Sequence, residues 1–321
     1  MTSSGNNIFS NIMTTHLKNW LINIKTRFLN NKNTEKIPIK NRLINIKNWV
    51  LNDKNAEDNY EWIKKATGIY LIIRFCSLLP HSAVLFSDQG VNIPWMIDVP
   101  EPNVIMAFLL TTSMIVGGAL FLIRNTNPKI IWGVLLVYTY LAMVEMGSSS
   151  GSFEMIQMCL LFFLGFAASF RTQSWMTRMF QIHVINIYLF ASLHKYTHQV
   201  WGTGTIFGNI LYNNWGGTEL CYQILPFLNQ PGIIQMAEYA VILTQLGLAI
   251  AFLSPLKYKI IPIVVSFLLH LSIGILLQLP EFLNMFILTL AFLTPADKNF
   301  IKNLALKWPQ KILSTSLKEP V

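Results

Sequence analysis

Residues Gln181–Gly204 read QIHVINIYLFASLHKYTHQVWGTG, an apolar run with helical character that ends in a lysine flanked by histidines. A Trp-Gly-x-Gly turn follows at once. Similar apolar runs recur along the chain, and several approach the roughly 20 residues needed to cross a bilayer. A lysine in such a run is costly unless it is paired, neutral or close to water. Lys195 is therefore either an interfacial anchor or a reactive amine.

The composition is that of a membrane protein. Of the 321 residues, 53% are hydrophobic and only 12% are charged, and the mean hydropathy is +0.45. A soluble domain usually carries about twice that share of charged residues. The N-terminus is polar and basic without a signal-peptide pattern, so we expect the first span to remain in the mature protein. The three cysteines are too scattered to predict a disulfide framework or a thiolate metal site.

The apolar runs predict an all-α, polytopic membrane bundle of about eight spans. The spans are expected at 67–87, 103–123, 130–146, 153–170, 179–197, 233–254, 259–279 and 281–295. Lysine and arginine collect in alternate loops and in the C-terminal tail, whereas acidic residues occupy the opposite loops. This pattern predicts that both termini are cytoplasmic. The net charge of +9 is then a topology signal, so the expected partner is the lipid bilayer and not nucleic acid.

Three regions are expected along the chain. The basic extension 1–65 contains a repeat, KNWLINIKTRFLNNKN at 18–33 and KNRLINIKNWVLNDKN at 40–55. Each copy places apolar residues on one helical face and basic residues on the other, which is typical of amphipathic helices in the membrane interface. The alternative is that the two helices pack on each other or on a partner. A transmembrane domain at 66–297 and a basic cytoplasmic tail at 298–321 follow.

The position of Lys195 runs against the topology signal. It lies at the external end of the fifth span, where the loops carry almost no other basic residue. A lysine in a poorly hydrated pocket can act as a base at ordinary pH. The alternative is a lysine that extends its amine to the interface, as helix-end lysines commonly do.

Other residues around Lys195 are candidates for the same site. Tyr188 shares its helical face, Trp201 lies in the turn that follows, and His270 lies near the middle of the seventh span. These three are the predicted cofactor-binding residues. The alternatives are an aromatic-belt role for Trp201 and an interhelical hydrogen bond for His270. Glu238 or Glu145 is a further candidate, as an ionic partner of Lys195.

His194 and His198 share a helical stripe at i, i+4 spacing. We predict that they assist Lys195 in catalysis. The same spacing can also place two imidazoles on one metal ion, with a third ligand from His270, Glu238 or His81. No HExxH motif is present, so we predict no metal site.

The key stretch resembles the HTTM family, the membrane domain shared by vitamin K-dependent γ-glutamyl carboxylases and many bacterial proteins. The matching pattern is Ile187-Tyr188-Leu189-x-Ala191-x-x-His194-Lys195, then Trp201-x-x-Gly204-Thr205. Arg74 in the first span is a supporting match, expected near the cytoplasmic headgroups. The resemblance covers most of 66–297. It implies that Lys195 is the base that, in the carboxylases, deprotonates vitamin K hydroquinone.

Two departures narrow this expectation. The pair is His-Lys and not Lys-Lys, and no large lumenal domain follows the spans, so Glu carboxylation itself is not expected. The run IYLxAxL…W…GT is similar to small bacterial membrane proteins that help to mature sporulation-delaying-type antimicrobial peptides. This resemblance implies modification of an exported peptide at the outer face of the bacterial cytoplasmic membrane, with a reduced quinone as co-substrate and a small accessory protein as partner. The alternatives are a non-enzymatic immunity, export-assisting or scaffold protein, and a metal-dependent oxidoreductase.

Overall fold

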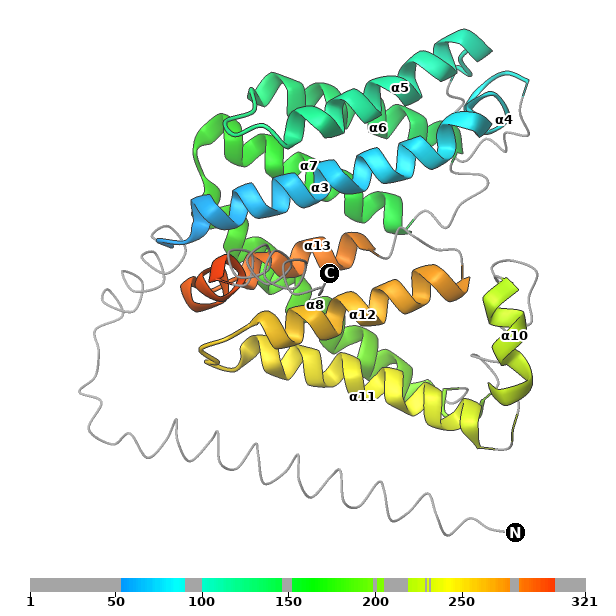
Figure 1. Ribbon diagram of the computed structural model, residues 1–321, viewed down its shortest axis with the longest axis vertical. Helices are drawn as coiled ribbons and strands as arrows, with labels where there is room; N and C mark the ends of the chain where they lie inside the picture. Colours follow the sequence, from blue (N-terminus) through cyan, green and yellow to red (C-terminus); the bar gives the residue numbers. More distant parts are fainter. Residues whose placement is uncertain are drawn as a thin grey trace, which may run out of the picture. The chain divides into compact units, whose positions relative to one another are not determined.

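The computed structural model describes residues 53–89, 100–145, 152–198, 201–204, 219–228, 230, 232–277 and 283–303. All regular secondary structure in these ranges is helical (Figure 1). The chain divides into two compact units, Met1–Val50 and Leu51–Val321. The predicted N-terminal amphipathic helices and most of the C-terminal tail lie outside the described residues.

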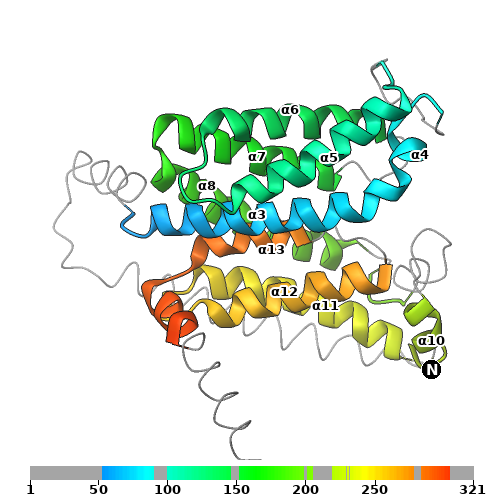
Figure 2. The ribbon, with the colours of Figure 1, turned by 45° about the horizontal axis from the view of Figure 1, so that its top comes forward.

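The first half of the larger unit is a layer of antiparallel helices. Helix α3 (Ala56–Leu78) continues through the 3-10 turn η1 (Leu79–His81) into α4 (Ser82–Phe86). Helices α5 (Val104–Phe121), α6 (Pro128–Glu145) and α7 (Ser152–Phe170) follow. Each packs on the helix before it, α3 on α5, α5 on α6 and α6 on α7 (Figure 2).

Two glycines let α3 and α5 approach each other closely in this layer. A Cβ atom on Gly68 of α3 would lie 2.5 Å from the carbonyl oxygen of Gly118 on α5, and one on Gly118 would lie 2.7 Å from that of Gly68. Small residues that let two helix backbones meet are a common device for packing helices in membranes. The contact of α3 with α5 therefore depends on both glycines.

The second half begins with α8 (Gln173–Thr197) and continues with α10 (Glu219–Leu228), α11 (Ile233–Leu253) and α12 (Ile260–Leu277). The short helix α13 (Leu283–Thr289) and the turn η3 (Leu290–Phe292) come last among the labelled elements, and residues 295–303 are again helical. Helix α11 packs along α8, whereas α13 contacts α3, α7, α8 and α12. Figures 1 and 2 show α13 between the two halves.

Three described segments are long and apolar enough to cross a membrane: Ala56–Phe86, Val104–Phe121 and Ile233–Leu253. Shorter apolar helices lie at Pro128–Val144, Glu154–Phe170, Ile260–Ile275 and Leu283–Phe292. Helix α8 belongs to neither group, because its first half is polar. Large apolar side chains are exposed on α5, α11 and α12, as expected for surfaces that face lipid. The all-α prediction is thereby confirmed for the described residues, and three of their helical segments could span a membrane by length and composition.

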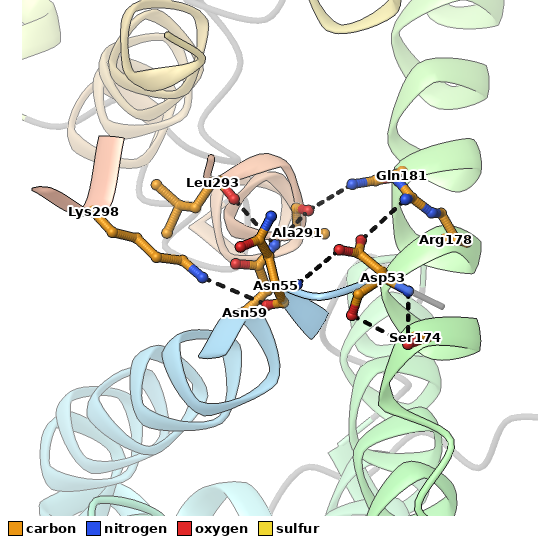
Figure 3. Close-up of polar contacts among 9 residues, drawn as sticks. All are labelled: Asp53, Asn55, Asn59, Ser174, Arg178, Gln181, Ala291, Leu293 and Lys298. Carbon is orange, nitrogen blue, oxygen red and sulfur yellow. Dashed lines mark hydrogen bonds and ion pairs between the residues drawn. The ribbon is translucent and has the colours of Figure 1, made fainter. Parts of the chain in front are cut away.

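Side chains at the end of the bundle where α3 begins tie three helices together (Figure 3). The Asn59 amide donates to the carbonyl oxygens of Ala291, at 3.0 Å, and Leu293, at 3.3 Å. The Gln181 amide donates to the same Ala291 oxygen at 2.7 Å. These bonds fix α3, α8 and η3 at one level along the bundle axis, and we call this the Asn59 end.

The first helix is longer than the sequence pattern predicts. Helix α3 begins at Ala56, ahead of the predicted start at 67, so residues 56–65 are part of it. Asp53, just before this helix, forms an ion pair with Arg178 at 3.2 Å (Figure 3). Lys64 is completely buried because its amine is bonded to Glu61 and to the carbonyl oxygen of Ile123, each at 2.9 Å.

Candidate functional site

Lys195 lies in the last turn of α8 and is held by two groups. Its amine donates to the side-chain oxygen of Gln245 on α11 at 3.1 Å. The same nitrogen lies 5.1 Å from the centre of the Trp201 ring, which is within the range of a cation–π contact. The side chain is partly buried. The amine is therefore positioned by the protein and does not extend freely into solvent.

The direction of the lysine side chain follows from the register of α8 and α11. The Ser192 hydroxyl donates to the Ile242 carbonyl oxygen at 3.0 Å, so these residues are level. The helices are antiparallel. Lys195 thus lies one turn nearer the end of α8, whereas Gln245 lies one turn nearer the middle of the bundle. The amine points back towards the interior, opposite to a lysine that extends towards water at the helix end.

A buried hydrogen-bonded trio lies deeper on the same side of α8. The Tyr188 hydroxyl lies 2.7 Å from the Ser266 hydroxyl and 2.8 Å from His270 Nε2. Tyr188 is 1% exposed and His270 is 4% exposed. Tyr188 and Lys195 lie two turns apart on the same face of α8, so the amine and the trio belong to one region. We call Lys195, Gln245, Tyr188, Ser266 and His270 the α8 site.

The turn after α8 holds Trp201 over the lysine. The backbone N–H groups of Gly202 and Gly204 donate to one carboxylate oxygen of Glu238, at 2.5 and 2.9 Å. Both glycines have positive φ, 84° and 81°, a conformation that glycine adopts without strain. Glu238 is completely buried. The carboxylate considered above as an ionic partner of Lys195 therefore binds this turn.

The two predicted catalytic histidines do not join the α8 site. His194 and His198 are both exposed, and their ring centres lie 5.3 Å apart. Around the helix axis, His194 lies about 100° from Lys195 and His198 about 60° on the other side. Among the described residues, no group of three or more His, Cys, Asp or Glu side chains is arranged to hold a metal ion. The expected assistance of Lys195 by His194 or His198 therefore lacks geometric support.

The other predicted residues are brought together. Lys195, Tyr188, Trp201 and His270 come from α8, its following turn and α12, and they converge on one side of α8. Gln245 and Ser266 were missed. Gln245 is a polar residue within the apolar sequence of α11, and this could have indicated its role from the sequence.

A second buried polar cluster was also missed by the sequence analysis. Arg74 on α3 forms an ion pair with Glu154 on α7 at 2.5 Å, with side-chain exposures of 4% and 2%. Arg74 also donates to the Tyr70 hydroxyl at 2.8 Å, and the Tyr138 hydroxyl donates to Glu154. The expectation that Arg74 reaches the headgroups is wrong, because α3 begins at Ala56 and the guanidinium lies far inside the bundle. Ionisable groups buried in this way commonly mark functional regions of membrane proteins.

No protein-family model, curated protein or solved structure matches this chain.

Proposed function

We propose that this chain is a polytopic protein of the bacterial cytoplasmic membrane in which Lys195 acts as a base on an exported peptide at the outer face. In this proposal the eight predicted spans are α3–α4, α5, α6, α7, α8, α11, α12 and α13–η3, with both termini in the cytoplasm. The alternation of basic and acidic loops supports that topology. The resemblance to HTTM proteins supports a peptide as substrate.

The contacts of the lysine amine carry the proposal. A base needs an amine that is held in place and can accept a proton. Among the described residues, the hydrogen-bond partner of the Lys195 amine is a neutral amide and not a carboxylate. The ammonium formed on protonation would be stabilised by the Gln245 oxygen and by the face of the Trp201 ring. Both charge states of the amine are therefore accommodated at one place.

Tyr188 and His270 are proposed as positioning residues. Their hydrogen bond is buried, and the Tyr188 hydroxyl is already bonded to Ser266 as well. A reduced quinone, implied by the resemblance as the oxidisable co-substrate, would be held by Lys195 and Trp201. The Lys195 amine would face its hydroxyl group and take up the proton.

The test compares peptides released by cells that carry the wild-type chain or Lys195→Met, which keeps the length of the side chain and removes the amine. Lys257→Met, at an exposed lysine between α11 and α12, is the matched control. Membrane fractionation establishes that both variants insert. We expect a modified peptide mass to disappear with Lys195→Met and to persist with Lys257→Met. An unchanged peptide spectrum with membrane-inserted Lys195→Met contradicts the base role.

One observation favours the non-enzymatic alternative. His194 and His198 are both exposed, and among the described residues the hydrogen-bond partner of the Lys195 amine is Gln245, so no contact supports the predicted assistance by a histidine. An immunity, export-assisting or scaffold protein would tolerate both Lys195→Met and His194→Ala. Full protection or export with both substitutions would support that function.

A further inference from the structure

Two amide side chains are buried between the halves of the bundle. Gln157 on α7 and Asn284 on α13 are both 0% exposed. Neither the oxygen nor the nitrogen of either amide has a hydrogen-bond partner among the described residues. Unpartnered polar groups are costly inside a protein, and more so within a bilayer, where lipid offers no hydrogen bonds. Each of these amides therefore requires a partner of another kind.

The two amides lie at one level of the bundle. Asn59 is bonded to Ala291 at the Asn59 end, and the neighbouring Tyr60 hydroxyl is bonded to the Leu164 carbonyl oxygen at 3.5 Å. Asn284 is seven residues before Ala291, and Gln157 is seven residues before Leu164. At 1.5 Å per residue, both amides are about 10 Å from that end. Since α7 and α13 are in contact, the two amides share one layer.

The same register places this layer beside the α8 site. Gln181 is hydrogen-bonded to Ala291. Tyr188 is seven residues along α8 from Gln181, and Asn284 on α13 is seven residues from Ala291. Helices α8 and α13 are in contact. On the other side, Glu154 is one turn from Gln157 on the same face of α7. The amides therefore lie between the Glu154 ion pair and the Tyr188–His270 pair.

We propose that Gln157 and Asn284 form a buried hydration site that holds a cluster of ordered water molecules. Each amide offers donors and an acceptor, and water is the smallest ligand that satisfies both. A cation would leave the NH2 groups unbonded, and an anion would leave the carbonyl oxygens unbonded. The nearby Arg74–Glu154 pair is already balanced in charge, so the layer provides no excess charge to attract an ion.

The water molecules would lie between Glu154 and the Tyr188–His270 pair. The hydration site does not rest on the proposed function of Lys195.

Radiolytic footprinting of the full chain in lipid nanodiscs tests the hydration site. X-ray pulses convert bound water to hydroxyl radicals that oxidise neighbouring side chains. Leu161 and Leu288 lie one turn beyond Gln157 and Asn284 on the same faces and are 0% and 2% exposed. We expect their oxidation to exceed at least tenfold that of Ile131, which is equally buried. Oxidation of Leu161 and Leu288 no greater than that of Ile131 overturns the proposal.

The double variant Gln157→Leu/Asn284→Leu replaces both amides by branched apolar side chains, and it should reduce the oxidation of Leu161 and Leu288 to the level of Ile131. Undiminished oxidation would show that these amides do not hold the water.

A second measurement uses only the wild-type chain, in case the variant does not fold. After rapid mixing into H2-18O, Leu161 and Leu288 should retain 16O label longer than Leu256, which is exposed in the loop between α11 and α12. Equal exchange times would contradict ordered, bound water. Neither readout depends on peptide modification.

Discussion

Replacing Glu154 with leucine should strongly destabilise the folded chain. The Glu154 carboxylate is 2.5 Å from the Arg74 guanidinium, and the two side chains are 2% and 4% exposed. Removing one partner of a buried ion pair costs about 3–5 kcal/mol, because the other charge loses its counter-charge. The Tyr138 hydroxyl also loses its acceptor, which adds about 1–3 kcal/mol. We therefore expect Glu154→Leu to lower the free energy of unfolding by at least about 3 kcal/mol.

The double variant Arg74→Met/Glu154→Leu separates this effect from general damage. It removes both charges, and replacement of a whole buried pair by apolar residues is often neutral or stabilising. We expect it to recover most of the stability lost in Glu154→Leu. The assay is unfolding of detergent-solubilised protein by SDS, followed by circular dichroism.

The surface pair Lys298–Asp58 provides the control, since Asp58 is 70% exposed. Lys298→Met should cost less than about 1 kcal/mol. The reasoning is refuted if Glu154→Leu is no more destabilising than Lys298→Met, or if the double variant is less stable than Glu154→Leu.

Three further predictions concern packing and the α8 site. Gly118→Ala places a Cβ atom 2.7 Å from the Gly68 carbonyl oxygen. It should lower the free energy of unfolding by about 1–3 kcal/mol in the same unfolding assay. Gly133→Ala on α6 is the control and should not destabilise the protein, because nothing lies within 4 Å of its new atom. Gly202→Ala places a Cβ atom 2.6 Å from the Tyr239 ring at a residue with positive φ. It should therefore displace Trp201 from Lys195. A shift in tryptophan fluorescence relative to the wild type would report this displacement. Tyr188→Phe removes the hydroxyl shared by Ser266 and His270 and should cost about 1–3 kcal/mol. Adding His270→Ala to Tyr188→Phe should cost less than His270→Ala alone costs in the wild type, and strict additivity would contradict their coupling.

The sequence predicted the helices well because apolar runs of span length leave few alternatives in a membrane protein. The start of α3 was missed, because Asp58, Glu61 and Lys64 make residues 56–65 resemble the basic extension. The structure shows why those residues are accommodated. Lys64 is buried against Glu61 and a carbonyl oxygen, and Asp58 is paired with Lys298. Ile123 and Lys298 are far in sequence from the residues that they contact, so these contacts have no local signature.

The α8 site was predictable in part. Helical spacing correctly placed Tyr188 and Lys195 on one face, and the proximity of Trp201 followed from its position just after the helix. The same spacing grouped His194 with His198 but did not indicate that their stripe faces outward. The partners Gln245, Ser266 and Glu154 depend on which helices pack together, which periodicity alone does not determine. The polar layer of Gln157 and Asn284 depends on the same long-range packing.

The most direct test of the central claim is chemical rescue of Lys195→Ala. Membranes that contain this variant are incubated with the released peptide precursor and increasing concentrations of propylamine, and the peptide mass is measured. If the Lys195 amine is the base, modification is absent without propylamine and returns in proportion to its concentration. Modification by Lys195→Ala at the wild-type rate, without any added amine, would contradict the claim.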